Sequence, residues 1–123
     1  MINNNKIFDI LNVGIDIVNV NRFKNKIYSK NPTFYEKIFL QSEIDYCNKF
    51  KSSYEHFAGK FAIKEALIKS INEKILPTDI EIFYKKSKPQ IKLKKFQSKY
   101  TFKISMSHEK DYAIAIVLSN LKK

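Results

Sequence analysis

The sequence contains one cysteine, two glycines, three prolines and no tryptophan. The single cysteine, Cys47, cannot form an internal disulfide, and with two histidines it leaves no plausible set of zinc ligands. Two glycines also leave no glycine-rich phosphate loop. We therefore expect Cys47 to be a small buried hydrophobe rather than a nucleophile.

Long apolar runs are absent as well. Asn, Asp or Lys interrupts every candidate before it reaches the roughly 20 residues that a membrane-spanning helix needs. Residues 1–12 lack the layout of a secretory signal, since they contain one lysine and no small-residue cleavage site. These features predict a soluble cytoplasmic protein with no membrane partner.

Acidic residues are scarce: 12 Asp and Glu stand against 23 Lys and Arg, which gives a formal net charge of +11. The electric field of such a positive charge attracts anionic partners, including nucleic acids, phosphorylated metabolites and acidic proteins. Arg22 is the sole arginine, so the rest of the basic residues are lysines, as expected of a codon bias towards A and T. Charge alone therefore leaves a solvated basic surface without a specific partner as an equally good interpretation.

The chain has no repeat and no linker, so residues 1–123 are expected to form one domain. Residues 11–17 alternate as in a strand, with Asp16 on the face opposite the aliphatic side chains. A long helix is predicted over residues 54–71, largely buried and opened by a capping box of Ser52 and Glu55. After Pro77 the pattern returns to alternation in four strands. The predicted fold class is thus α+β, with a long buried helix packed on a mainly antiparallel sheet. Shorter helices are predicted from about Asn21 with Ile27 inward, from Pro32 to Phe39, and from Ser42 with Phe50 buried.

Two carboxylates, Asp16 and Glu65, lie in apolar sequence settings where an unpaired charge is costly. Oxygen ligands suit magnesium, which one or two carboxylates can hold when water and substrate phosphates complete its octahedron. Two other interpretations remain open at this point. Glu65 can pair with Lys69 one helical turn away, and Asp16 can cap the helix that follows.

Six motifs, taken together, resemble the holo-acyl-carrier-protein synthases, the small single-domain branch of the 4′-phosphopantetheinyl transferases. The resemblance covers nearly the whole chain, and order and spacing both agree. The motifs are Gly14-Ile15-Asp16-Ile17-Val18 followed by Arg22, Lys37-Ile38-Phe39-Leu40 with Glu43, Phe57-Ala58-Gly59-Lys60-Phe61-Ala62-Ile63-Lys64-Glu65-Ala66, Asp79-Ile80-Glu81-Ile82, Lys88-Pro89, and Ser105-Met106-Ser107-His108 before Tyr112-Ala113.

The resemblance implies a homotrimer with active sites at the subunit interfaces. There Asp16 and Glu65 would bind Mg²⁺ together with the pyrophosphate of coenzyme A, and His108, which is expected to be accessible after a strand, would line the coenzyme A site. The catalytic set would be these three residues. The remaining implied roles are substrate-phosphate contacts for Lys64 and Lys69, with Lys60 where the family often has arginine, and carrier-protein binding for Arg22, Lys24 and Lys26.

The implied reaction transfers 4′-phosphopantetheine from coenzyme A to a serine of apo-acyl carrier protein, in support of fatty acid biosynthesis. The sequence departs from the family where Asn72-Glu73-Lys74 replaces a glycine-rich turn and where Ser87 replaces a glycine. A basic nucleic-acid-binding module is the alternative. We expect no nucleic-acid partner, because the two carboxylates would repel its phosphates.

Overall fold

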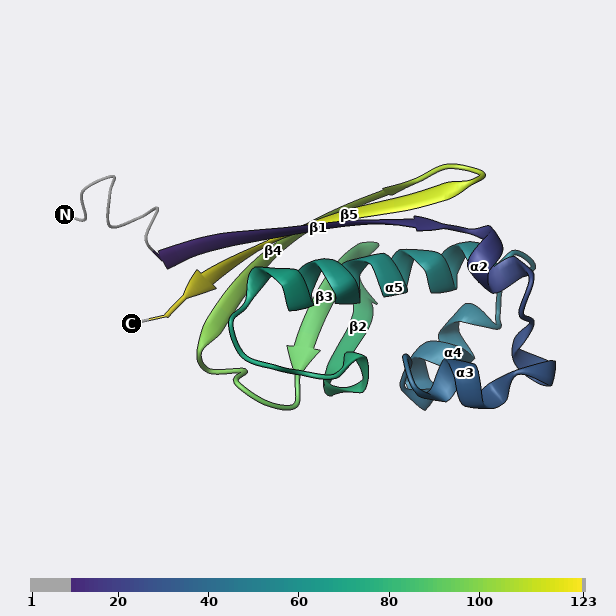
Figure 1. Ribbon diagram of the computed structural model, residues 1–123, viewed down its shortest axis with the longest axis horizontal. Coiled ribbons are helices and arrows are strands. Elements are labelled where there is room, and N and C mark those ends of the chain that lie inside the picture. Colours follow the sequence, from purple (N-terminus) through teal and green to yellow (C-terminus); the bar gives the residue numbers. More distant parts are fainter. Residues whose placement is uncertain (1–9, 123) are drawn as a thin grey trace.

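The computed structural model describes residues 10–122, so the part of the N-terminal expectation that rests on residues 1–9 lies outside the described residues. One long helix lies between a three-stranded sheet on one side and a hairpin with short helices on the other (Figure 1). The elements in chain order are β1 (Leu11–Asn19), α2 (Asn21–Lys24), the 3₁₀ turn η1 (Tyr28–Lys30), α3 (Pro32–Glu36), α4 (Gln41–Cys47), α5 (Ser53–Ser70), the 3₁₀ turn η2 (Pro77–Asp79), β2 (Ile80–Lys85), β3 (Lys88–Leu93), β4 (Tyr100–His108) and β5 (Tyr112–Leu121).

Both sheets are antiparallel, which confirms the predicted fold class. The larger sheet has the order β1-β5-β4, and β2 and β3 form a separate hairpin. The register pairs Asp16 of β1 with Ala115 of β5, and Ala115 with Met106 of β4. Since side chains alternate along a strand, these three residues share one face of the sheet.

The two faces of the larger sheet differ in the size of their side chains. The face towards α5 carries small buried residues, including Gly14, Ala113 and Ala115, which let the helix approach the strands closely. Over β1 and β5, the opposite face is mainly aliphatic and exposed to solvent in the single chain. Its exposed large hydrophobic residues are Leu11, Val13, Ile15, Ile17, Tyr112, Ile114, Ile116 and Leu118.

Helix α5 matches the predicted helix to within one residue at each end, and it is buried on most sides because it has neighbours on both (Figure 1). The predicted capping box does not form. The Ser52 side chain makes no capping hydrogen bond, and the contact at this end joins backbone atoms, the Glu55 N–H and the Ser52 carbonyl oxygen at 3.1 Å. Among the described residues, no helix combines the length and apolarity needed to cross a membrane.

The sequence-based prediction is least accurate for the short helices. Helix α2 has only four residues, and Ile27, predicted to point inward, is exposed. The hydroxyl of Tyr35 holds this loop by donating to the carbonyl oxygens of Phe23 and Lys26. Phe50 is also exposed, with its ring stacked on His56. Local periodicity could not reveal these contacts.

Candidate active site

Asp16 and Glu65 lie on two elements that pack directly against each other. Asp16 is on the inner face of β1, and Glu65 is on α5 beside Ala66, whose carbonyl lies against Gly14. Close packing at Gly14 therefore brings the strand that carries Asp16 towards the helix that carries Glu65.

The two carboxylates influence each other electrostatically. Burial raises the pKa of Glu65, and the negative charge of Asp16 raises it further, while Lys69 and Arg22 act in the opposite direction. The Lys69 ammonium lies 3.0 Å from Asp16 Oδ1, and the carboxyl side chain of Asp16 is only 17% exposed. The pair of carboxylates thus shares one partly shielded region with a lysine at its border.

The simpler interpretations of these carboxylates were wrong. The ion pair of Lys69 is with Asp16 on the neighbouring strand, and no ion pair between Lys69 and Glu65 is found among the described residues. Asp16 does not cap the next helix either, because the Asn21 N–H donates to Asn19 Oδ1 at 2.9 Å. Asp16 is thus paired with Lys69 across the strand–helix contact, and Glu65 has no ion pair among the described residues.

The donor set suits a hard divalent ion such as magnesium. Within residues 10–122, no group of three or more His, Cys, Asp or Glu side chains could enclose a metal. Magnesium does not need such an enclosure, because it retains water and takes substrate phosphate oxygens. Two carboxylates that influence each other electrostatically, Asp16 and Glu65, fit an ion whose remaining ligands come from solvent and a diphosphate.

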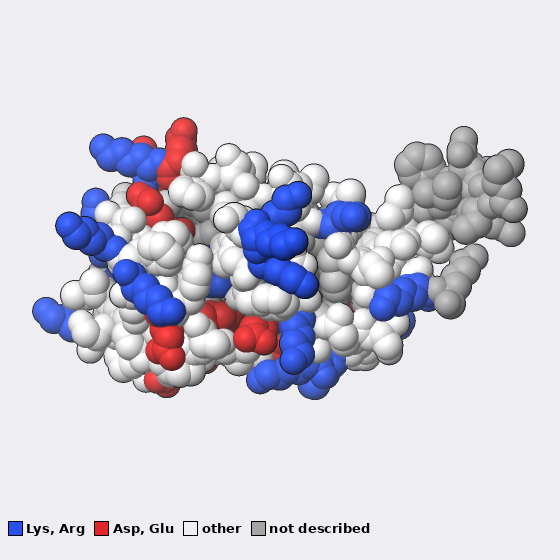
Figure 2. Space-filling model, turned by 180° about the vertical axis from the view of Figure 1, so that it is seen from behind, with Lys and Arg blue, Asp and Glu red and all other residues white. Residues whose placement is uncertain are grey.

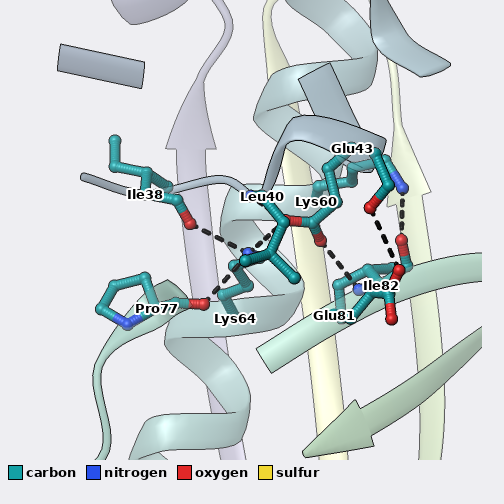
Figure 3. A network of polar contacts seen from close by, with 9 residues as sticks. Ile38, Leu40, Glu43, Lys60, Lys64, Pro77, Glu81 and Ile82 are labelled. Atoms are coloured by element: carbon teal, nitrogen blue, oxygen red, sulfur yellow. Dashed lines mark hydrogen bonds and ion pairs between the residues drawn. The ribbon is translucent and has the colours of Figure 1, made fainter. Parts of the chain in front are cut away.

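The single chain does not bring Lys60 and Lys64 to this region, because both are buried and their ammonium groups donate to internal acceptors. The contacts with substrate phosphates that the resemblance implies for them stay predictions. Lys64 is completely buried, and its ammonium donates to the carbonyls of Ile38 at 2.9 Å and Pro77 at 3.0 Å and to Glu43 Oε1 at 2.6 Å (Figure 3). All three ammonium protons are therefore used. Burial lowers its pKa, with Glu43 acting in the opposite direction.

Lys60 is also buried, and its ammonium donates to the Ile82 carbonyl oxygen at 2.7 Å. The same ammonium lies over the rings of Tyr46 and Tyr84, at 4.7 and 4.8 Å from their centroids. Its charge is stabilised inside the protein by a carbonyl oxygen and two π faces. Lys60 thus ties α5 to β2.

Glu43 has a structural role that residue patterns did not reveal. Its Oε1 accepts from the Leu40 N–H at 2.8 Å as well as from Lys64, and its Oε2 accepts from the Ile82 N–H at 2.8 Å (Figure 3). One buried carboxylate thereby joins the start of α4, helix α5 and strand β2. Its place in the family motif was the only available signal.

His108 is exposed at the end of β4, as predicted, but the single chain does not bring it to the carboxylates. It pairs with Ala113 of β5, and β5 separates β4 from β1. Two strand spacings amount to about 10 Å, too far for a shared contact with Asp16. His108 does influence another histidine, His56. The pKa of His56 is lowered by burial first and then by the charge of His108.

The predicted partner-binding cations lie around α2 and rest on aromatic rings. The Arg22 guanidinium is 5.2 Å from the centroid of Phe61, and the Lys26 ammonium is 4.7 Å from that of Phe34. Lys24 lies over Tyr54 in the same manner. An open depression of about 600 Å³ beside them has a mainly apolar surface and is lined by Asn19, Asn21, Arg22, Asn25, Lys26, Phe34, Ile38 and Phe61.

Comparison with known protein families identifies the family of the chain. A sequence model described as the 4′-phosphopantetheinyl transferase superfamily matches residues 12–117. The chain belongs to this superfamily. The family predicted from the six motifs is thereby confirmed.

Curated relatives agree with this assignment over most of the chain. A holo-[acyl-carrier-protein] synthase of Clostridium tetani is 39% identical over 119 residues, covering 86% of this chain and 92% of the relative. One of Mycoplasma capricolum is 41% identical over 111 residues, covering 89% and 94%. These relatives confirm the enzyme class as a phosphopantetheinyl transferase.

Solved structures of the family share the fold. A holo-(acyl-carrier-protein) synthase from Bacillus anthracis, described in complex with CoA (3′,5′-ADP), superposes with a TM-score of 0.76 at 28% identity, covering 92% of this chain and 98% of that one. The Helicobacter pylori enzyme, in complex with coenzyme A, gives a TM-score of 0.74 at 33% identity, covering 88% and 99%.

Proposed function

We propose that the chain transfers 4′-phosphopantetheine from coenzyme A to a serine of apo-acyl carrier protein, giving holo-acyl carrier protein and adenosine 3′,5′-bisphosphate. The observation that carries this proposal is the convergence of Asp16 and Glu65, with Lys69 beside them, in a chain whose relatives are holo-[acyl-carrier-protein] synthases. The structures of related enzymes with coenzyme A support the donor.

In the proposed reaction, the serine oxygen forms a bond to the β-phosphorus of coenzyme A while the bond from that phosphorus to the bridging oxygen breaks. The bridging oxygen leaves with adenosine 3′,5′-bisphosphate. Asp16 and Glu65 would hold a Mg²⁺ ion, which would supply positive charge for the diphosphate. Lys69, whose side chain is 54% exposed, can add an ammonium to the phosphate oxygens. Glu65, whose pKa is raised by burial, is suited to accept the serine proton through a water molecule.

The depression beside α2 is the proposed docking site of the carrier protein. Its lining combines the cations Arg22 and Lys26 with the apolar side chains of Phe34, Ile38 and Phe61. An acidic amphipathic helix complements such a surface through both charge and apolar contact. On the face drawn in Figure 2, Lys and Arg side chains are widely spread while Asp and Glu form small groups, which favours attraction of an acidic partner.

A homotrimer that buries the outer sheet face completes the proposed site. The eight large hydrophobic residues of β1 and β5 that are exposed in one chain form an apolar surface of the kind that marks protein interfaces. His108 lies two strands away from Asp16 within one chain, so a neighbouring subunit is the proposed source of the histidine at each pair of carboxylates. A cytoplasmic location and a role in fatty acid biosynthesis remain predictions.

Transfer of radiolabel from labelled coenzyme A to purified apo-carrier, with and without Mg²⁺, tests the function. We expect Mg²⁺-dependent labelling by the wild type and none by Asp16→Asn, with circular dichroism confirming that the variant is folded. Absence of labelling by the wild type would contradict the function. Full activity of Asp16→Asn at saturating Mg²⁺ would remove the metal role.

The same assay also tests the proposed docking site and, in combination with nucleic-acid binding, the alternative function. Arg22→Glu should raise the KM for the carrier protein without changing the KM for coenzyme A. Steeply salt-dependent binding to single-stranded nucleic acid together with no labelling would favour the alternative module.

A further inference from the structure

Lys69 bridges two atoms of β1 at the border of the candidate active site. Its ammonium donates to Asp16 Oδ1 and to the carbonyl oxygen of Ile15, each at 3.0 Å. Lys69 lies one helical turn after Glu65 on α5, so its ammonium reaches the same region as both carboxylates. A positive charge thus already occupies part of the region that suits a divalent ion.

The contact is of a kind that can be exchanged at little cost. The Lys69 side chain is half exposed, and an ion pair in such a setting changes an equilibrium by a factor of about five or less. Its ammonium also keeps a third proton for another acceptor, since two contacts are recorded among the described residues.

Lys64, five residues earlier on the same helix, is held in place much more firmly. It is fully buried, and its three protons are all bound to fixed acceptors. Releasing it would leave the Glu43 carboxylate buried without its partner, which is costly. On helix α5, Lys64 is therefore fixed, whereas Lys69 can move.

We propose that Lys69 is a stand-in cation. Its ammonium neutralises Asp16 while no metal is bound, and it moves to a substrate phosphate when a divalent ion binds to Asp16 and Glu65. This inference rests on the proposed function, and it adds that Lys69 acts in opposite directions on the two ligands. It weakens binding of the metal alone and strengthens binding of coenzyme A once the metal is present.

The test measures Mn²⁺ binding without coenzyme A, using electron paramagnetic resonance of free Mn²⁺. Lys69→Gln should lower the Kd for Mn²⁺ about threefold to fivefold, because Asp16 no longer has a competing partner. Arg22→Gln is the matched control. It also removes a positive charge that acts on Glu65, but the guanidinium lies over Phe61 and is recorded in no ion pair with Asp16. We expect its effect on the Kd to be clearly smaller.

A second titration adds coenzyme A to the Mn²⁺-loaded protein and is followed by calorimetry. Here Lys69→Gln should have the opposite effect, so that the Kd for coenzyme A is raised. Equal tightening of Mn²⁺ in Lys69→Gln and Arg22→Gln would overturn the inference, because general charge repulsion then accounts for the effect. Unchanged or weaker Mn²⁺ binding in Lys69→Gln would overturn it as well.

Asp16→Asn distinguishes a failure of this inference from a failure of the metal site itself. If Asp16→Asn abolishes Mn²⁺ binding while Lys69→Gln has no effect, the metal site stands and the stand-in role is refuted. If Mn²⁺ binding persists unchanged in Asp16→Asn, the proposed metal site fails and the role of Lys69 fails with it.

Discussion

Gly14 of β1 lies directly against the backbone of Ala66 in α5. A Cβ added at Gly14 would be 1.8 Å from the Ala66 carbonyl oxygen, a distance at which the strand or the helix must shift. Gly14 precedes Asp16 by two residues on the same strand face, and Ala66 follows Glu65. The absence of a side chain at Gly14 therefore sets the separation between the strand and the helix that carry the two carboxylates.

Gly14→Ala should destabilise the protein by about 3 kcal/mol or more, at the upper end of the range for overpacking, because the clash is with backbone. Gly59→Ala is the matched control on α5. Its Cβ would meet only the flexible end of Met106, at 3.2 Å, and alanine is the better helix former.

Chemical denaturation of both variants measures the difference. A Gly14→Ala protein as stable as Gly59→Ala would contradict the close packing of β1 on α5. If Gly14→Ala folds, we also expect weaker Mg²⁺ binding, since the two carboxylates are then farther apart.

Glu65→Gln should stabilise the metal-free protein at neutral pH. The pKa of Glu65 in the folded state is raised above its ordinary value of 4.5, so the ionised form lowers stability once the pH exceeds the raised pKa. Below pH 4.5 the glutamic acid is neutral in both the folded and the unfolded state, and the advantage of glutamine disappears.

Thermal unfolding across this pH range, without Mg²⁺, checks the expectation. The Tm of Glu65→Gln should exceed that of the wild type at pH 7, and the gap should close as the pH falls through 4.5. A gap that is absent at pH 7, or that widens in acid, would show that burial and Asp16 do not penalise the charge of Glu65.

Ser87→Gly should stabilise the β2–β3 hairpin by about 1 kcal/mol. Lys86 and Ser87 form its two-residue turn, with φ values of 52° and 66°, and this left-handed conformation is costly for residues with a Cβ. Ser87→Ala retains the Cβ and should give no such gain. Denaturation of the two variants decides between them, and equal stability would contradict strain at this position.

Ile15→Lys should break the proposed trimer without unfolding the protein. Ile15 is 56% exposed in the single chain and pairs with Ile116 in the middle of the outer sheet face. Ile27→Lys is the control, because Ile27 is similarly exposed, at 53%, but lies between α2 and η1 away from that face.

Light scattering coupled to size-exclusion chromatography should give a trimer for the wild type and Ile27→Lys and a monomer for Ile15→Lys. Loss of transfer activity should accompany the monomer, since His108 of a neighbouring subunit is then missing. A wild-type monomer with full activity would refute the proposed assembly.

Strong local patterns allowed β1, α5 and the antiparallel β half to be predicted. Alternation over residues 11–17 placed Asp16 on the correct face of β1, and the family motif identified Glu65. The roles of Lys60 and Lys64 could not be predicted from the helix itself. Their partners, including Glu43 and Ile82, come from distant segments, and helical periodicity shows which face a residue lies on but not which element covers it.

The position of a divalent ion relative to Asp16 and Glu65 tests the central claim most directly. It can be measured by anomalous scattering from Mn²⁺ in crystals of the protein grown with coenzyme A. The account predicts one Mn²⁺ peak bound by both carboxylates and by oxygens of the coenzyme A diphosphate. Coenzyme A bound with its diphosphate away from this pair of carboxylates, or Mn²⁺ coordinated by neither Asp16 nor Glu65, would contradict it.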